Sequence, residues 1–260
     1  MLRSLYTAAT GMDAQQLKMD VISNNLANAS TTGFKAARAE FEDLLADTIR
    51  GSGAPGTNGG APTPLQVGLG VQAGSTSRMF GQGTLTTTQN PTDLAIQGSG
   101  FFQVQLATGE LAYTRAGNFT LDATGRLVTQ NGQLVQPGIT IPQNASNLTV
   151  KSDGTVSVTV GSSTTPTQVG QIQIFNFTNP TGLSDIGNNL YTETGASGTA
   201  QQIRATDPGA PTIAQGQLEG SNVSAVEQMV EMIACQHAYE LNSKVIQSAD
   251  QMLGRLTSIK

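Results

Sequence analysis

The chain has 260 residues, of which 37% are hydrophobic and only 12% are charged, and its net charge is −5. This length allows one large domain or two modest ones, and the charged fraction is about half the usual value. The 13 Lys and Arg residues are spread thinly, without a basic patch, which argues against nucleic-acid binding. A surface with so few charges suits dense packing against neighbouring molecules.

The sequence contains few features that indicate a cellular compartment or a bound cofactor. Cys235 is the single cysteine, so an intramolecular disulfide and a thiolate metal cluster are excluded. No run of 18 apolar residues predicts membrane insertion, and the first residues lack the pattern of a cleaved secretion signal. We therefore expect no cofactor, no metal and, if the chain leaves the cytoplasm, export without a cleaved signal peptide.

Residues 1–33 predict a helix that ends near Gly33, which can adopt a left-handed conformation. Apolar residues recur at steps of three and four, as in a coiled-coil seam. The seam positions are Leu2, Leu5, Ala9, Met12, Met19 and Leu26. Residues 34–70 are expected to be a connecting segment, and the Gly- and Pro-rich stretch 51–64 predicts a loop or an extended arm.

Residues 71–220 show the alternation of short strands and turn signals. In 101–106, Phe102, Val104 and Leu106 are expected to face a core, and Asn131-Gly132 predicts a tight hairpin. The run 171–177 changes phase midway, which predicts a strand covered on both sides or bulged. The pattern favours a mainly antiparallel sandwich or partial barrel.

Residues 221–260 predict a second long helix, which begins with the capping box Ser224-x-x-Glu227 or at the rival cap Asn222. Its seam positions are Val226, Val230, Ile233, Leu241, Val245, Met252 and Leu256. The predicted fold class is α+β: the N- and C-terminal helices, 1–33 with 221–260, form a discontinuous, coiled-coil-like pair, and 71–220 form a β-rich outer domain. Such seams are buried against each other or against copies of the same chain.

Catalytic groupings are absent from the sequence. His237, the only histidine, lies in the helical seam and has no nucleophile or orienting acid that could be named near it. Asp122 and Asp153 occur in turn sequences, where aspartate makes local hydrogen bonds. We therefore expect no catalytic residues and no enzyme activity.

Both ends and the middle of the chain carry motifs that resemble those of one known protein family. Within 23–35, the family signature comprises Asn24, Asn25, Leu26, Ala27, Asn28, Thr32, Gly33, Phe34 and Lys35. The stretches 221–230, 237–244 and 250–253 resemble the matching C-terminal end, and 100–104, 113–119 and 122–128 resemble the middle. Together these stretches resemble the bacterial flagellar rod and hook protein family. The length of the middle favours the distal rod members, with a proximal rod member of similar size as the alternative.

This resemblance implies an axial structural subunit in the flagellar basal body, spanning periplasm to outer membrane. Its implied partners are further copies in a helical homopolymer around an export channel, the proximal rod and hook proteins, and the surrounding P and L ring proteins. Phe41 and Leu45 resemble the short motif that docks such subunits at the type III export gate; an amphipathic turn is the alternative reading. Two alternatives of other classes are a β-rich binding module with coiled-coil dimerisation and an enzyme that trims peptidoglycan.

Overall fold

The computed structural model describes residues 2–50, 64–161, 165–203 and 209–258. The chain forms two compact units. The helical unit contains Met1–Ala27, Ala37–Ser77 and Ser224–Lys260, and the β unit contains Asn28–Ala36 and Arg78–Val223. The expected boundaries differ in two respects. Residues 37–77, expected to be part of the connecting segment and the start of the β-rich domain, belong with the helices. Residues 28–33 and 221–223, expected in the helical domain, belong to the β unit.

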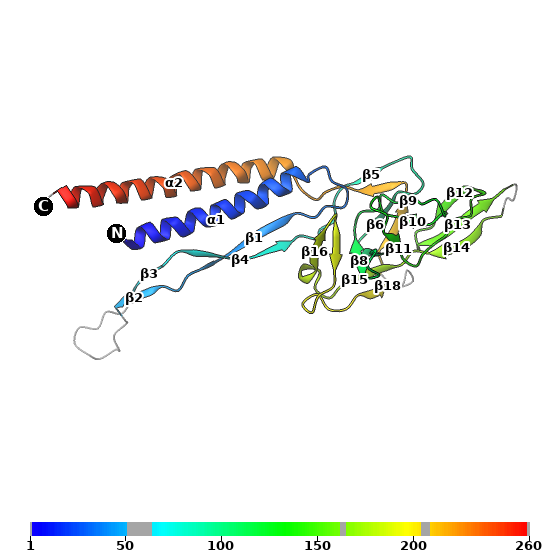
Figure 1. The fold of residues 1–260 in the computed structure, drawn as a ribbon, viewed down its shortest axis with the longest axis horizontal. Coiled ribbons are helices and arrows are strands. Elements are labelled where there is room, and N and C mark those ends of the chain that lie inside the picture. The colour runs from blue at the N-terminus through cyan, green and yellow to red at the C-terminus, as the bar shows by residue number, and fades with distance from the viewer. Residues whose placement is uncertain (1, 51–63, 162–164, 204–208, 259–260) are drawn as a thin grey trace. The chain divides into compact units, whose positions relative to one another are not determined.

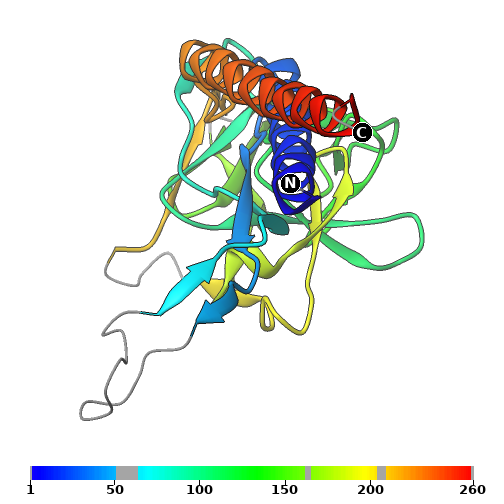
Figure 2. The ribbon, with the colours of Figure 1, turned by 90° about the vertical axis from the view of Figure 1, so that its left-hand side faces the viewer.

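The helical unit joins both ends of the chain. Helices α1 (Leu2–Ala27) and α2 (Ala225–Ser258) lie side by side (Figures 1 and 2), with the N-terminus of α1 near the C-terminus of α2. Strand β1 (Ala37–Asp43) contacts α1 and pairs with β4 (Val71–Arg78), which explains why these strands belong to this unit. Strands β2 (Asp47–Arg50) and β3 (Leu65–Val67) pair antiparallel, and the predicted loop 51–64 lies, except for Pro64, outside the described residues.

The start of α2 follows the predicted capping box in part. The Ser224 hydroxyl accepts a hydrogen bond from the Glu227 backbone N–H at 3.4 Å, so Ser224 is the N-cap. The rival cap Asn222 has a different role, because its side chain accepts from the Ala36 N–H and donates to the Met79 carbonyl. The helix has 34 residues and is therefore about 50 Å long.

The β unit is mainly antiparallel, as expected. Its remaining described strands are β5 (Leu85–Thr87), β6 (Leu94–Gln97), β7 (Phe101–Gln105), β8 (Leu111–Thr114), β9 (Thr120–Leu121), β10 (Leu127–Val128), β11 (Leu134–Val135), β12 (Ala145–Val150), β13 (Thr155–Val160), β14 (Thr167–Gln171), β15 (Ile174–Asn176), β16 (Ser184–Gly187), β17 (Leu190–Thr192), β18 (Gln201–Ile203), β19 (Thr212–Gln215) and β20 (Gln217–Glu219). A short 3-10 helix covers Pro180–Gly182.

The described strands of this unit form one sheet of nine, one of three and two pairs. The large sheet has the order β16-β17-β8-β7-β11-β10-β9, with β15 and β18 attached through β7. The small sheet is β12-β13-β14, and the pairs are β6 with β19 and β5 with β20. The predicted hairpin is confirmed, because β10 and β11 pair around Gly132, whose φ is +81°.

Strand β7 contributes to two cores. Phe102 and Val104 are fully buried in a core that Val150 and Val156 of the small sheet complete, so the inward residues of this strand are as predicted. Phe101, on the opposite face, is 2% exposed and lies in an aromatic cluster with Tyr113, Phe177 and Tyr191. The large sheet is therefore covered on both faces.

The run 171–177 is not a single strand. Strand β14 ends at Gln171 and β15 begins at Ile174. Ile172 and Ile174 enter the aliphatic core, whereas Phe175 and Phe177 belong to the aromatic cluster. The break at 172–173 separates the two sheets, whereas the phase change lies within β15, which is covered on both faces as predicted: Ile174 faces the aliphatic core and Phe175 the aromatic cluster.

Candidate assembly surface

The contact between α1 and α2 uses small and polar side chains. Cys235 is 2% exposed, and its thiol contacts the Gln15 backbone carbonyl at 3.0 Å. A Cβ added at Gly11 would lie 2.9 Å from the Asn242 amide nitrogen, so the two helices approach closely there. These contacts run antiparallel along the pair, because residues later in α1 meet residues earlier in α2.

The paired face of α2 repeats every seven residues. It carries Gln228, Cys235, Asn242 and Ala249. Ala249 is 1% exposed, and Gln228 accepts a hydrogen bond from the Asn25 side chain at 3.1 Å. The terminal helices thus pack together as expected, but the face that α2 uses is not the predicted seam.

The predicted seam of α2 is instead exposed to solvent. Two residues along a helix rotate the side chain by about 200°, so Ile233 points away from the face that carries Cys235. The exposed fractions are 69% for Val226, 62% for Val230, 54% for Ile233, 61% for Leu241, 46% for Val245 and 51% for Met252. We call these six residues the exposed row; the side chain of Leu256 lies outside the described ones.

The predicted seam of α1 lies beside the helix contact. Leu5, Ala9, Met12, Met19 and Leu26 are all half-buried, and the side chain of Leu2 is not among those described. At a half-buried position, part of the apolar surface is covered within one chain, and the rest is accessible to another molecule. In the described chain, α2 therefore carries the larger share of uncovered apolar surface.

His237 interrupts the exposed row. Its side chain is 71% exposed, and its Nδ1 atom lies 3.9 Å from a carboxylate oxygen of Glu240. Among the described residues, no group of three or more His, Cys, Asp and Glu could hold a metal ion. No described helix has the length and apolarity needed to cross a membrane.

Three regions of the chain match models of flagellar proteins. Residues 5–35 match the flagella basal body rod protein model, 95–158 the flagellar hook protein FlgE/F/G D1 domain, and 214–259 the flagellar basal body rod FlgEFG protein C-terminal model. The chain is 51% identical over its whole length to the flagellar basal-body rod protein FlgG of Caulobacter vibrioides, which it covers completely.

The chain belongs to the flagellar rod and hook family. It is also 41% identical, with both chains fully covered, to the flagellar basal-body rod protein FlgG of Bacillus subtilis. A flagellar hook protein FlgE of Helicobacter mustelae is 46% identical over 52% of this chain and 30% of its own. The similarity to rod proteins thus extends from end to end, whereas the similarity to this hook protein is partial.

The family signature lies mainly inside the protein. Asn25 is 3% exposed; its amide donates to the Ala37 carbonyl at 2.8 Å, and its side-chain oxygen accepts from the Ala37 N–H at 2.9 Å. Gly33 has φ of +71°, and a Cβ there would lie 2.5 Å from the backbone nitrogen of Ala116. These two residues therefore have structural roles that other side chains would not fill.

The end of the signature enters the β unit. The guanidinium carbon of Arg78 lies 5.3 Å from the centre of the Phe34 ring, a cation–π distance. Asn28 accepts a hydrogen bond from the Thr31 hydroxyl at 3.2 Å, and the Thr32 carbonyl accepts one from Asn189 at 2.9 Å. Asn24 and Ala27 are exposed at the end of α1.

Lys35 belongs to a buried ionic network that the sequence did not predict. Its ammonium group donates to Glu219 at 2.5 Å and to the Gly81 carbonyl at 2.7 Å, and both charged side chains are fully buried. Arg115 donates to the other Glu219 oxygen at 3.1 Å. Burial lowers the pKa of Lys35, and the hydrogen bond to Glu219 opposes that shift.

The residues of the predicted export motif are in extended chain. Phe41 is half-buried in β1, whereas Leu45 is 89% exposed and follows the end of that strand. The alternative reading as an amphipathic turn is wrong, because such a pair would need a helical turn over 41–45. A long, exposed apolar side chain at position 45 is available for another protein.

Proposed function

We propose that this chain is a structural subunit of the distal part of the flagellar rod and has no catalytic role. The observation that carries the proposal is the exposed row of α2, in a chain that is similar over its full length to basal-body rod proteins. An aligned apolar surface of this kind marks an interaction site. The proximal rod alternative is not favoured, because the full-length relatives are FlgG proteins.

In this proposal the exposed row packs against the helices of neighbouring copies. Fully burying a large apolar side chain contributes roughly 1.5–3 kcal/mol, so the six half- to two-thirds-exposed residues together contribute several kcal/mol per subunit. Repetition along a helical homopolymer divides the torque among many equivalent contacts. The small, polar pairing face would hold α1 and α2 together within each subunit, independently of that assembly.

The position of the subunit follows from the same proposal. The terminal helices would line the export channel, and the β unit would lie outside them. The partners are then the proximal rod and hook proteins at the two ends, and the P and L ring proteins around a segment that spans periplasm to outer membrane. Leu45, with Phe41, would contact the type III export gate before assembly.

The test compares two faces of α2. Ile233→Asp and Leu241→Asp place a charge in the exposed row and should block rod assembly and swimming, because that charge would be buried in the interface. Gln236→Asp is the matched control: Gln236 is exposed on the same helix but outside the row. Ile233 is a better target than Leu26, which is half-buried within one chain.

The readouts are electron microscopy of isolated basal bodies, motility and circular dichroism. Circular dichroism should remain unchanged in all three variants, since these positions are solvent-exposed. Normal swimming by both row variants would reject the proposal. A protease-protected, discrete dimer of the dilute wild-type chain would favour the binding-module alternative.

A further inference from the structure

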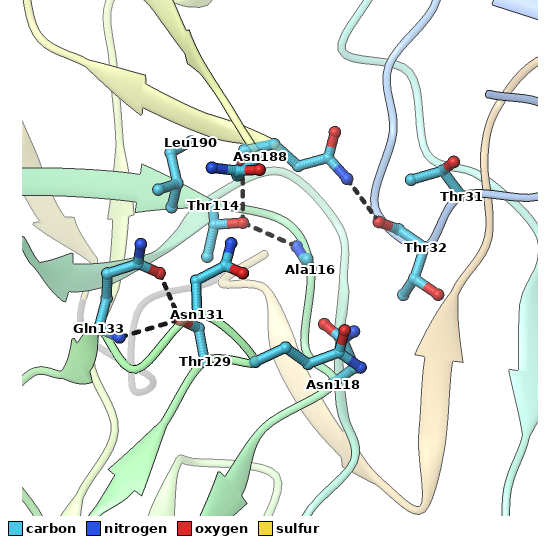
Figure 3. A pocket seen from close by; sticks show the side chains of 12 residues that line it. Thr31, Thr32, Thr114, Ala116, Asn118, Thr129, Asn131, Gln133, Asn188 and Leu190 are labelled. Carbon is cyan, nitrogen blue, oxygen red and sulfur yellow. Dashed lines mark hydrogen bonds between the residues drawn. The ribbon is translucent and has the colours of Figure 1, made fainter. Parts of the chain in front are cut away.

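The β unit contains a polar cavity that the exposed row does not involve. Its volume is about 410 Å³, within the range of ligand sites. Three turns surround it: 31–32, the β10–β11 turn at 129–133 and the β16–β17 turn at 188–190 (Figure 3). Every lining residue belongs to the β unit.

Internal hydrogen bonds fix the walls of this cavity. The Thr114 hydroxyl donates to the Asn189 carbonyl at 2.8 Å and accepts from the Ala116 N–H at 3.1 Å. The Asn189 amide donates to the Thr32 carbonyl at 2.9 Å, which ties two of the turns together (Figure 3). Asn188 and Asn189 have φ of 56° and 58°, a left-handed pair typical of a tight hairpin turn. The shape of the cavity is thus preformed.

Several amides in the lining are not used within the chain. In the described part of the molecule, no side-chain hydrogen bond involves the amides of Asn118, Gln130, Asn131 or Asn188. Three of the four are exposed and Asn118 is half-buried. Each primary amide carries both donors and an acceptor. The cavity therefore presents neutral amides that have no partner within the described chain, on a frame fixed by hydrogen bonds.

The chemistry of the lining selects the class of ligand. The lining contains neither a charged nor an aromatic side chain: besides Ala116 and Leu190 it consists of Thr, Asn and Gln. A phosphate, carboxylate or cation would find no counter-charge. A sugar ring would find no aromatic wall for its apolar face. Peptide groups match best, because a side-chain amide reproduces their donor–acceptor pair.

We infer that this cavity binds an uncharged polar loop of a second copy of this chain. The inference rests on the proposed function, which brings copies together at high local concentration. The chain supplies suitable loops, because only 12% of its residues are charged and 30 are glycines, which leave peptide groups accessible. The cavity would thus be a lateral contact between β units, separate from the apolar contact along α2.

A first experiment introduces charge at the rim. Gln130→Lys with Asn131→Lys places two cations beside neutral partners and should raise the subunit concentration needed for polymerisation at least tenfold. Gln168→Lys is the control, since Gln168 is exposed on β14 and does not line the cavity. Tyrosine fluorescence and circular dichroism verify that each variant folds. Unchanged polymerisation by the double variant overturns the inference.

A second experiment identifies the occupant. A photo-crosslinking amino acid at Asn131, introduced in the bacterium that makes the chain, should give an adduct with an uncharged segment of a second copy, located by mass spectrometry. An adduct with another protein, or chitotriose shifting the amide resonances of the cavity in the dilute chain, overturns the inference in favour of that ligand.

The two proposals fail in different ways. If Ile233→Asp blocks assembly while the rim variants assemble normally, the cavity inference fails and the proposed function stands. If the wild-type chain forms no rod, both fail.

Discussion

At the scale of single residues, the β unit contains a network of buried charges, which carries an electrostatic cost. Glu219 is fully buried and accepts hydrogen bonds from Lys35, Arg115 and the Gly83 N–H. Three donors thus share this one carboxylate, and two of them are cations. In the described part of the chain, the Arg115 Nε atom has no partner at all. The network therefore fixes positions more than it adds net stability.

Removing the shared carboxylate should be costly. We expect Glu219→Gln to destabilise the protein by about 3–5 kcal/mol, because Lys35 and Arg115 would both be left as buried charges without a counter-ion. Urea unfolding followed by circular dichroism measures this loss. Glu110→Gln, at an exposed site, should change the free energy of unfolding by less than about 0.5 kcal/mol. Equal effects of the two substitutions would contradict the role of the network.

Tyr191 should make stability fall at alkaline pH. Burial raises the pKa of its hydroxyl from the usual 10.0 to about 12. The unfolded chain therefore loses this proton first, and the folding contribution is complete below pH 10 and is lost as the pH rises to about 12. We expect Tyr191→Phe to reduce this alkaline loss in unfolding experiments, at little cost at pH 7, because the Tyr191 hydroxyl has no hydrogen-bond partner in the described structure.

Local roles could be predicted from the sequence, and distant ones could not. Asp122 and Asp153 accept backbone hydrogen bonds within their turns, from Thr124 and Thr155, as their sequences indicate. Lys35 and Glu219 are separated by 184 positions, so no spacing rule links them. One feature of the sequence could have indicated the network. Arg115 and Glu219 are charged residues beside apolar strands, in a chain that has few charges.

At the scale of elements, the two long helices show how periodicity can identify a surface but not its partner. The 3–4 spacing identified α2 and its apolar face. It missed the pairing face, because a heptad of Gln228, Cys235, Asn242 and Ala249 is not distinguished by hydrophobicity. Small residues permit close helix contact without a large apolar area, and only the three-dimensional contact with α1 reveals them.

Asn25 is the polar link among three elements of the helical unit. We expect Asn25→Ala to lower the free energy of unfolding by roughly 1–3 kcal/mol, because the Ala37 N–H and carbonyl and the Gln228 side chain would all lose a partner. Thermal unfolding, followed at the helical circular-dichroism band, measures this loss of stability. Gln16→Ala, at an exposed position of α1, is the control and should be neutral or slightly stabilising.

At the scale of the whole molecule, the low charge predicts how the polymer responds to solutes. We expect the critical concentration for assembly to change little between 50 and 500 mM sodium chloride, because the exposed row is apolar and its burial is not screened. Sodium sulfate should lower it, since this salt strengthens apolar burial. Light scattering measures both. A steep increase with sodium chloride would indicate an interface held by ion pairs.

The exposed row also has a consequence for the ends of such a polymer. In the proposed assembly, each added subunit covers the row of its predecessor and presents its own, so the terminus offers the same apolar surface at every length. The surface at the terminus does not change with the number of subunits that have been added. Growth along the row is therefore open-ended, and its arrest requires a different molecule that occupies the last row or removes the supply of subunits.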